Sequence, residues 1–450
     1  MLGELLRPEI EELIAARDFQ GLREAFDKME PVDVADVIDD LPVQEQVVLF
    51  RVLPREDAAR VFEYLDRPHQ EELIKNLSGA AARQILDEMS PDDRTALLAE
   101  LPAEVTRTLL QILSPEELQV ARQLLGYPEN SVGRLMTPDY VALSPDLTSA
   151  QALEEIRRIG RGKETLINIF LIDAAGHLVG DVELGEIVLS DPQVMLRDLV
   201  VHQLAPVPAT ADQEEALELA RRYDRTTLPA VDTLGKLIGI VTVDDLLDVA
   251  EEEATEDIQK MGAVQALENP YFGTDHWTMF RKRVVWLTSL FVGGMLTAHA
   301  MERYGRSEAA LHLLIFLPLV LSAGGNSGSQ SASLVIRGLA VGEMALADWW
   351  KVFLREVLMG HVLGLALGLV GFLRALLGGQ TVMEATALGA TLVGVVTCGT
   401  FVGSMMPFAL RRAGLDPAVS SSPFIASFVD VTGIVLFFSV ASLVLRWAGM

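Results

Sequence analysis

The chain has 450 residues with 63 acidic and 36 basic side chains, a formal net charge of −27, and half of its residues are hydrophobic. This length exceeds that of a single domain, and the acidic balance argues against a nucleic-acid partner, because a phosphate backbone requires a basic surface. The same balance permits divalent cations, which take carboxylate oxygens as ligands. With one cysteine, Cys398, in an apolar segment, neither a disulfide framework nor a CxxC metal site is expected.

Charge divides the chain into two parts. Nine acidic and twelve basic residues lie between Asp275 and the C-terminus, so the residues before Asp275 carry about thirty net negative charges. Charges become scarce and glycine becomes frequent from Gln265 onward. The N-terminus lacks the basic, apolar and small-residue order of a signal peptide, and we expect the acidic part to stay in the cytoplasm.

The first 128 residues carry a repeat of apolar residues spaced by twelve. The repeated positions are Met29, Leu41, Leu53, Leu65, Leu77, Met89, Leu101 and Leu113. Most are followed within two residues by proline or serine, which predicts the end of one helix and the first turn of the next. We therefore expect helices of about nine residues, paired in hairpins and stacked into an all-α superhelix. This domain contains no catalytic constellation, which indicates a regulatory or interaction module.

A second repeat lies further along the chain. The segment from Leu171 to Gly180 is matched 59 residues later by the segment from Ala230 to Gly239, and each reads as strand, Asp-x-x-Gly turn and strand. With the helix expected on either side, this resembles a tandem pair of cystathionine-β-synthase-type (CBS) α/β domains. We place them at residues 129–195 and 196–249.

Such pairs often bind adenine nucleotides through a Thr-x-x-Asp at a helix start, and the second copy has Thr242-Val-Asp-Asp245. The first copy has Glu183 and Glu186 in that pattern and no hydroxyl. The resemblance therefore implies ATP at one site only, on Thr242 and Asp245.

An acidic helix is expected to connect the CBS pair to the membrane over residues 250–275. Its charge run holds no base: Asp244, Asp245, Asp248, Glu251, Glu252, Glu253, Glu256 and Asp257. Like charges three and four residues apart destabilise an isolated helix. The run is either a solvated acidic face or a switch whose repulsion divalent ions relieve by bridging it to another acidic surface. Its position next to the membrane favours the switch.

The remaining residues, 276–450, predict an α-helical transmembrane domain. We expect five spans, near 282–302, 311–339, 350–376, 385–410 and 423–447, each near the ~20 residues that a bilayer requires. Eight Lys and Arg residues flank the ends on the N-terminal side of the membrane and four flank the other ends. This asymmetry predicts a cytoplasmic N-terminus and a C-terminus outside.

Two spans carry polar residues that packing alone does not require. The second holds Gly324, Gly325, Asn326 and Gly328, and it is either a tight small-residue contact or a loosened backbone whose freed carbonyls and Asn326 face a wet cavity. The fifth holds Asp430 in an apolar run. A mid-membrane carboxylate costs roughly 2.5–3.5 kcal/mol on insertion scales. A protonated Asp430 bonded to a neighbouring helix would meet this cost, but a cation site is the favoured reading.

The order of parts, with Gly-Gly-Asn-x-Gly-x-Gln from Gly324 and Ser-x-x-Asp-x-x-Gly from Ser427, resembles the MgtE family of magnesium channels. The resemblance implies a homodimer in the bilayer, with a pore lined by the second and fifth spans. The implied pore residues around a hydrated Mg²⁺ are Asp430, Asn326, Gly325 and Ala426. The implied regulatory Mg²⁺ ligands are Asp92, Glu214, Asp224, Asp245, Asp248, Glu253, Glu256 and Asp257.

Two departures from the family pattern stand out. Arg60 and Ala96 occupy positions where relatives can carry acids, so the contact between the N-terminal domain and the CBS pair is expected to hold fewer ions. Gly185 and Glu186 replace two usual nucleotide contacts, which weakens the expectation of ATP.

The sequence thus predicts a multidomain Mg²⁺-selective channel of the cytoplasmic (inner) membrane, closed by cytosolic Mg²⁺ and not an enzyme. The alternatives are a Mg²⁺ or Co²⁺ carrier and a membrane-anchored CBS-type ion or nucleotide sensor. A carrier usually shows inverted repeats with paired broken helices, and only one glycine-broken span is expected here. A simple anchor would not keep Asp430 in the membrane.

Overall fold

The structure is a computed structural model that describes residues 2–65, 67–200, 205–267, 271, 274–304 and 313–447. The chain forms two compact units, Met1–Glu251 and Glu252–Met450, and each is described by itself. The finer domain boundaries given above stay predictions.

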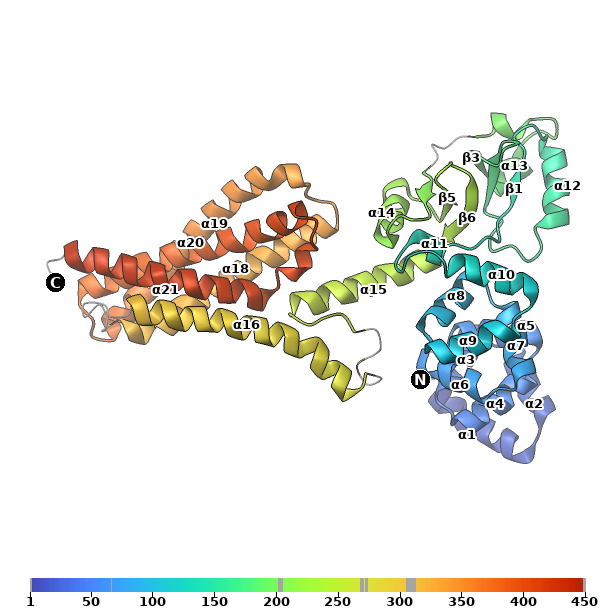
Figure 1. Cartoon of the computed structure of the whole chain (residues 1–450), viewed down its shortest axis with the longest axis horizontal. Coiled ribbons are helices and arrows are strands. Elements are labelled where there is room, and N and C mark those ends of the chain that lie inside the picture. The colour runs from blue at the N-terminus through green and yellow to red at the C-terminus, as the bar shows by residue number, and fades with distance from the viewer. Residues whose placement is uncertain are drawn as a thin grey trace. The chain divides into compact units, whose positions relative to one another are not determined.

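The N-terminal helices form a stack of short hairpins (Figure 1). They are α1 (Leu2–Ala16), α2 (Phe19–Phe26), α3 (Pro31–Asp39), α4 (Val43–Val52), α5 (Arg55–Glu63), α6 (Arg67–Asn76), α7 (Gly79–Glu88), α8 (Pro91–Glu100), α9 (Ala103–Ile112) and α10 (Pro115–Leu124). Ser78, Ser90 and Ser114 cap α7, α8 and α10 by accepting a backbone amide three residues on. The serines of the repeat are therefore helix caps, as predicted.

Stacking supplies the core of this domain, because one short hairpin cannot bury its own apolar face. Odd-numbered helices from α1 to α9 pack on one another in sequence, as do α2, α4 and α6. The repeat positions Leu41, Leu65, Met89, Leu101 and Leu113 are all buried at helix ends. The predicted superhelix is confirmed.

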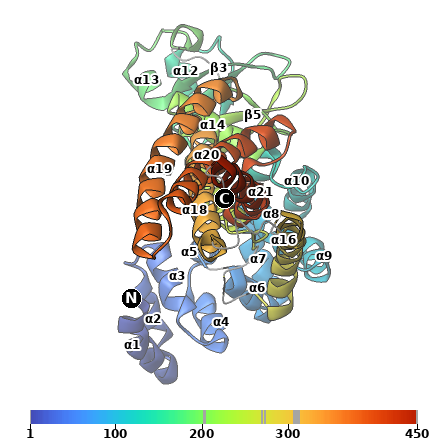
Figure 2. The same ribbon diagram turned by 90° about the vertical axis from the view of Figure 1, so that its left-hand side faces the viewer.

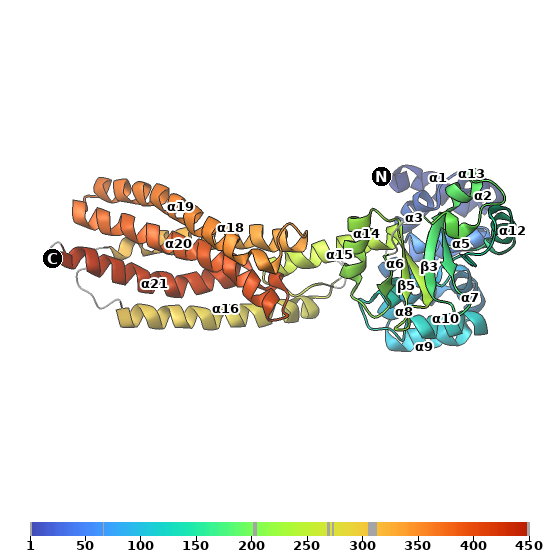
Figure 3. The same ribbon diagram turned by 90° about the horizontal axis from the view of Figure 1, so that it is seen from above.

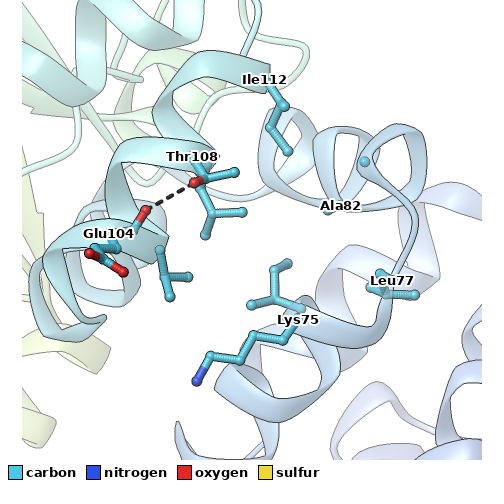
Figure 4. Close-up of a pocket in the computed structure, with 10 residues that line it drawn as sticks. Lys75, Leu77, Ala82, Glu104, Thr108 and Ile112 are labelled. Carbon is cyan, nitrogen blue, oxygen red and sulfur yellow. Dashed lines mark hydrogen bonds between the residues drawn. The ribbon is translucent and has the colours of Figure 1, made fainter.

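A cavity of about 410 Å³ lies in this stack between α6, α7 and α9. Figure 4 shows Lys75, Leu77 and Ala82 on one side and Glu104, Thr108 and Ile112 on the other. Thr108 Oγ1 donates to the carbonyl of Glu104 at 2.9 Å, so this hydroxyl is already satisfied within α9. The lining is mostly apolar, and the cavity carries no cluster of carboxylates.

Two three-stranded sheets follow α11 (Val132–Leu135). The first contains β1 (Ala142–Leu143), β2 (Asn168–Ile172) and β3 (Leu178–Glu183), with α12 (Ser149–Ile159), α13 (Leu184–Leu189) and the 3-10 turn η1 (Leu196–Asp198). The second contains β4 (Val207–Pro208), β5 (Thr227–Val231) and β6 (Leu237–Thr242), with α14 (Gln213–Tyr223) and the long α15 (Val243–Met261). In each sheet the first strand pairs parallel and the last pairs antiparallel to the middle strand.

In the two copies of the 59-residue repeat, the strands of the hairpin pair in the same register. Ile169 pairs with Val182 in the first sheet, and Leu228 pairs with Val241 in the second. Both hairpins shift register at the same place, after Leu171 and after Ala230. Gly176 and Gly235 have φ of 87° and 80°, which explains the glycine of each Asp-x-x-Gly turn. The tandem CBS fold is therefore confirmed.

The second unit is a bundle of long helices that run side by side in Figures 2 and 3. They are α16 (His276–Tyr304), α18 (Leu317–Ala340), α19 (Trp349–Leu377), α20 (Val382–Arg412) and α21 (Ser422–Trp447), joined in part by the 3-10 turns η2 (Leu314–Phe316), η3 (Leu346–Asp348) and η4 (Pro417–Val419). Both views place α16 and α19 at opposite edges, with α18, α20 and α21 between them.

Among the described residues, four helices are long and apolar enough to cross a membrane: His276–Arg303, Leu346–Leu377, Val382–Arg412 and Ser422–Val444. The predicted second span is not among them, so five spans are not confirmed. Its residues 311 and 312 lie outside the described residues. Its remainder, α18, is a helix of 24 residues whose serines, glycines and Asn326 lower its hydropathy.

The expectation of a loosened backbone in this span is wrong. α18 is one continuous helix through Gly324, Gly325 and Gly328, so its carbonyls serve the helix and are not freed. The glycines instead allow helices to approach closely: a Cβ at Gly328 would lie 2.9 Å from the carbonyl oxygen of Gly399 on α20. Small-residue packing, the other reading of this motif, accounts for Gly324 and Gly328.

Candidate functional site

Asn326 lies on a polar row of α18. Ser322, Asn326 and Gln330 are spaced by four residues, so they share one face of the helix, and all three are exposed on the single chain. Asn326 Nδ2 donates to Ser322 Oγ at 3.3 Å, which leaves the amide oxygen of Asn326 as an acceptor. A polar row of this kind in a membrane helix requires water, an ion or another protein surface opposite it.

Helix α21 lies against α18 and carries the acidic residue. Gly325 faces Ala426, because a Cβ at Gly325 would lie 3.4 Å from the Ala426 Cβ. Asp430 follows Ala426 by one turn and is half-buried. Within the described part of the chain, no hydrogen bond or ion pair holds the Asp430 carboxylate. No described residue of this chain therefore supports the alternative in which a neighbouring helix hydrogen-bonds a protonated Asp430.

A second acidic site lies within the first unit, between the helical domain and the CBS pair. We call it the acidic cluster, and its members are Glu63, Asp92, Asp93, Asp139, Glu164, Asp244 and Asp245. Asp92 is 6 % exposed, and its buried Oδ1 has no hydrogen-bond partner among the described residues. Asp245 accepts a hydrogen bond from Thr242 Oγ1 at 2.7 Å. Lys163 Nζ contacts Asp139 at 2.9 Å, at one edge of the cluster.

Burial first, and the charges of neighbouring carboxylates second, raise the pKa of Glu63, Asp92 and Glu164. Burial raises the pKa of Glu63 to about 7, and the charge of Asp93 adds to this effect. Burial likewise raises the pKa of Asp245 to about 7 against the hydrogen bond from Thr242, which lowers it. Asp92 has a pKa well above its usual range, first because of burial and then because of Asp245. Compact packing of the cluster therefore opposes full ionisation.

We expect this contact to loosen as the pH rises when no divalent ion is present. In the compact arrangement Glu63 and Asp245 have pKa values of about 7, whereas separated carboxyls lose their protons near pH 4. The compact form thus binds more protons, and its stability falls as pH rises through about 7. Limited proteolysis of the chelator-treated protein should be faster at pH 8 than at pH 6. Asp245→Asn should flatten this dependence, and equal digestion of the unmodified protein at both pH values would contradict it.

A third acidic group lies within the second unit, where the end of α15 meets the loop before α21. Lys260 Nζ contacts Asp416 Oδ2 at 2.7 Å and also pairs with Glu256. Burial alone would lower the pKa of Lys260, but its hydrogen bonds to these two carboxylates raise it. The pKa of Asp257 is raised by burial and then by Asp416. Asp416 also caps η4 through the Ala418 amide, at 2.8 Å.

The structure brings some of the predicted regulatory residues together and separates others. Asp92 and Asp245 meet in the acidic cluster, and Glu256 and Asp257 meet around Lys260. Glu253 lies one turn before Asp257, and its charge adds to the raised pKa of Asp257. The other predicted ligands lie apart from these groups: Asp248 on α15, and Glu214 and Asp224 at opposite ends of α14, roughly 15 Å apart by helix geometry. One ion cannot be held by both ends of α14 in one subunit.

Sequence reasoning missed Glu63, Asp93 and Glu164 in the acidic cluster, and Asp416 beside Lys260. For Glu63 and Asp93, a sequence signal was available near Arg60 and Ala96, the positions where relatives can carry acids. Glu63 lies one turn after Arg60, and Asp93 lies one turn before Ala96, so acidic groups remain on both helix faces. Glu164 and Asp416 lie in loops and carry no such helical signal.

No group of three or more His, Cys, Asp or Glu side chains in the described ranges is close enough to hold a metal ion as it stands. The acidic cluster is therefore two facing sets of carboxylates rather than one closed ligand set.

Three family models match the chain: the MgtE intracellular N domain over residues 29–130, a CBS domain over 194–252, and the MgtE divalent cation transporter over 317–440. The magnesium transporter MgtE of Thermus thermophilus is 37% identical over 449 residues, covering 99% of this chain and 100% of that protein. The magnesium transporter MgtE of Bacillus subtilis is 28% identical, over 95% of this chain and 94% of that protein.

Two solved structures resemble the cytoplasmic part. The cytosolic domain of the Mg²⁺ channel MgtE in complex with ATP is 34% identical with a TM-score of 0.51, and the match covers 53% of this chain and 98% of that one. The soluble part of a magnesium transporter is 25% identical with a TM-score of 0.53, over 56% of this chain and 99% of that one.

Proposed function

The chain belongs to the MgtE family of magnesium transporters, and from this premise we propose that it forms a Mg²⁺-selective channel that cytosolic Mg²⁺ closes. The observation that carries the proposal is Asp430, a half-buried carboxylate in an apolar helix with no partner among the described residues. A cation bound to Asp430 would offset the free-energy cost of placing this negative charge in the membrane.

In this proposal the ion keeps much of its water shell. Mg²⁺ dehydrates reluctantly and is usually held through few carboxylates and several waters. Asp430 supplies the charge, while the amide oxygen of Asn326 and the close Gly325–Ala426 contact shape the space for the hydrated ion. Selectivity then rests on charge and size rather than on complete dehydration. The polar row of α18 is exposed on one chain, which supports a second copy across the pathway and hence a homodimer.

Closure uses the acidic surfaces. Without Mg²⁺ the carboxylates of the acidic cluster repel one another, and Asp92 has a buried oxygen to offer a ligand. Mg²⁺ bound between Asp92 and Asp245 would replace this repulsion by attraction and stabilise the compact form by mass action. Ions at the end of α15, near Glu256 and Asp257, would act in the same way beside the loop that leads into α21. Glu253, one turn before Asp257, would join this site, and Glu214, Asp224 and Asp248 remain proposed ligands elsewhere.

ATP at Thr242 and Asp245 stays a proposal, which the ATP complex of the cytosolic domain of the Mg²⁺ channel MgtE supports, but two contacts in this chain oppose it. The Thr242 hydroxyl is engaged by Asp245, and Asp245 faces Asp92 and Glu164, whose charges repel a triphosphate. We propose that this end of the CBS pair takes a divalent cation in place of a nucleotide.

The remaining assignments follow from the same premise. The relatives are named as transporters, and we propose a transport function without enzymatic activity. We place the protein in the inner membrane, with α18 as a fifth span, the acidic domains in the cytoplasm and the C-terminus outside.

Lys260 provides a testable part of the closing mechanism. Its ammonium already bridges Glu256 and Asp416, so it acts as a tethered cation where Mg²⁺ would otherwise be required. We expect Lys260→Gln to need severalfold more cytosolic Mg²⁺ for closure, because the removed charge must be replaced by ions. The readout is Mg²⁺ uptake at stepped internal Mg²⁺. Lys351→Gln, which loses an exposed ion pair with Asp348 in the second unit, is the matched control. Closure of Lys260→Gln at unchanged Mg²⁺ would refute this role.

The function itself is tested by Mg²⁺ flux into liposomes that contain the purified protein. Uptake that is fast, selective for Mg²⁺ over Ca²⁺ and stopped by internal Mg²⁺ supports the gated channel. Slow saturating exchange would favour the carrier, and no flux would favour the anchored sensor.

A further inference from the structure

Glu356 is a carboxylate of the membrane unit that neither the pathway nor the closing mechanism uses. It is partly buried, near the N-terminal end of α19, one turn before a row of glycines at Gly360, Gly364 and Gly368. This row is the face that α19 packs on α20, since a Cβ at Gly360 would lie 2.1 Å from Thr400 Oγ1. The four-residue spacing places Glu356 on the same face, toward the interior of the bundle.

Its partner belongs to a different helix. Ser331 on α18 is 4 % exposed, and its hydroxyl donates to Glu356 Oε2 at 2.6 Å. This bond links α19 to α18 across the bundle. It is a directional contact between two helices that otherwise touch each other little, because each packs mainly against α20.

Helix α18 needs such a contact. The middle of its interface with α20 is made of glycines, with Gly328 against Gly399 and Gly324 close to Val395, while Val320, Ile336 and Leu339 are buried toward its two ends. Glycine and apolar contacts permit close approach but are not directional, so the rotation and depth of α18 depend on its hydrogen bonds, which include Ser329 Oγ to the Ser422 carbonyl at 3.3 Å and Ser331 to Glu356. Ser331 lies five residues after Asn326, about 140° around the helix. The bond to Glu356 therefore holds α18 from a side away from its polar row.

We propose that Glu356 is a positioning residue for Mg²⁺ transport: through Ser331 it fixes the rotation and depth of α18, and with them the placement of Asn326 beside α21. This inference rests on the proposed function, in which α18 and α21 line the pathway. Glu356 does not touch the ion in this account. Its contribution is the hydrogen bond that it accepts, so a neutral acceptor of the same shape can replace it.

The test is a set of variants measured as Mg²⁺ flux in liposomes that contain the full-length protein. Glu356→Ala and Ser331→Ala should each lower the maximal flux by about tenfold, the factor that one ordinary hydrogen bond represents. Glu356→Gln should retain most of the flux, because its amide oxygen still accepts from Ser331. The double alanine variant should be no worse than either single variant, as expected of two residues that act through one bond.

Leu358→Ala is the matched control, because Leu358 is 68% exposed on the outer side of α19. The positioning role is overturned if Glu356→Gln is as impaired as Glu356→Ala, if the two alanine effects multiply, or if both alanine variants transport normally. Should an alanine variant fail to fold, Ser331→Cys replaces it, because a thiol is a weak donor and the flux should fall, whereas Ser331→Thr keeps the hydroxyl and should keep the flux; equal flux in these two variants overturns the role. Asp430→Asn, measured in parallel, separates the two proposals: normal flux in that variant refutes the pathway itself.

Discussion

Replacing Asp430 by Asn is expected to lower Mg²⁺ flux by at least about a hundredfold while the protein stays folded. The reason is electrostatic. Placing a carboxylate at mid-membrane costs roughly 2.5–3.5 kcal/mol of insertion free energy. In the proposed pathway, the attraction between the carboxylate and the cation offsets this cost. An interaction of that size corresponds to about a hundredfold in occupancy. Asparagine keeps the shape of the side chain and removes the charge, so the helix packing around Val429 and Gly433 is undisturbed.

The control for this variant is Glu343→Gln, which removes a carboxylate from the exposed loop between α18 and α19. Its flux should equal that of the unmodified protein. Oligomeric state and thermal unfolding should match for all three proteins. Normal flux through a folded Asp430→Asn protein would contradict the proposed cation pathway and leave the polar row of α18 without an assigned function.

Neutralising the acidic end of α15 is expected to have the second large effect. The variant Glu253→Gln/Glu256→Gln/Asp257→Asn should continue to take up Mg²⁺ at internal concentrations that stop the unmodified protein. Two attachments are lost together in this variant. Lys260 loses its Glu256 partner, and Mg²⁺ loses carboxylates near Asp416 that it would bridge. Of the ion pairs among the described residues, Lys260–Asp416 alone then holds the end of α15 beside the loop that leads into α21.

Glu251→Gln serves as the control, because Glu251 is exposed and precedes this end of α15. Uptake is measured with a fluorescent Mg²⁺ indicator inside liposomes loaded with stepped Mg²⁺. If the triple variant stops at the same internal Mg²⁺ as the control, α15 is only a solvated acidic helix.

Most of the fold could be predicted from the sequence, because each repeat corresponds to one structural unit. The twelve-residue spacing marks helix ends, so the caps at Ser78, Ser90 and Ser114 could be predicted. The 59-residue repeat gave the paired sheets down to their glycine turns. The backbone of α18 was predicted wrongly, because glycines that break a helix and glycines that pack one helix on another look alike until the partner, here Gly399, is known.

The candidate sites divide in the same way. Asp430 was identifiable because a single acidic residue in a long apolar segment can be recognised from the sequence alone. Asp92 and Asp245 required the family resemblance, since 153 residues separate them in the chain. Glu164 could not be identified from sequence, because it lies in a loop and joins the acidic cluster only through the tertiary fold. Glu356 is hidden for a similar reason, since its partner Ser331 is on another helix.

The most direct test is the current across inside-out membrane patches while Mg²⁺ is stepped on the cytoplasmic face. The account predicts unitary currents at low Mg²⁺ that disappear as Mg²⁺ rises and persist in the Glu253→Gln/Glu256→Gln/Asp257→Asn variant. Flux without unitary steps, or currents that ignore cytoplasmic Mg²⁺, would contradict it.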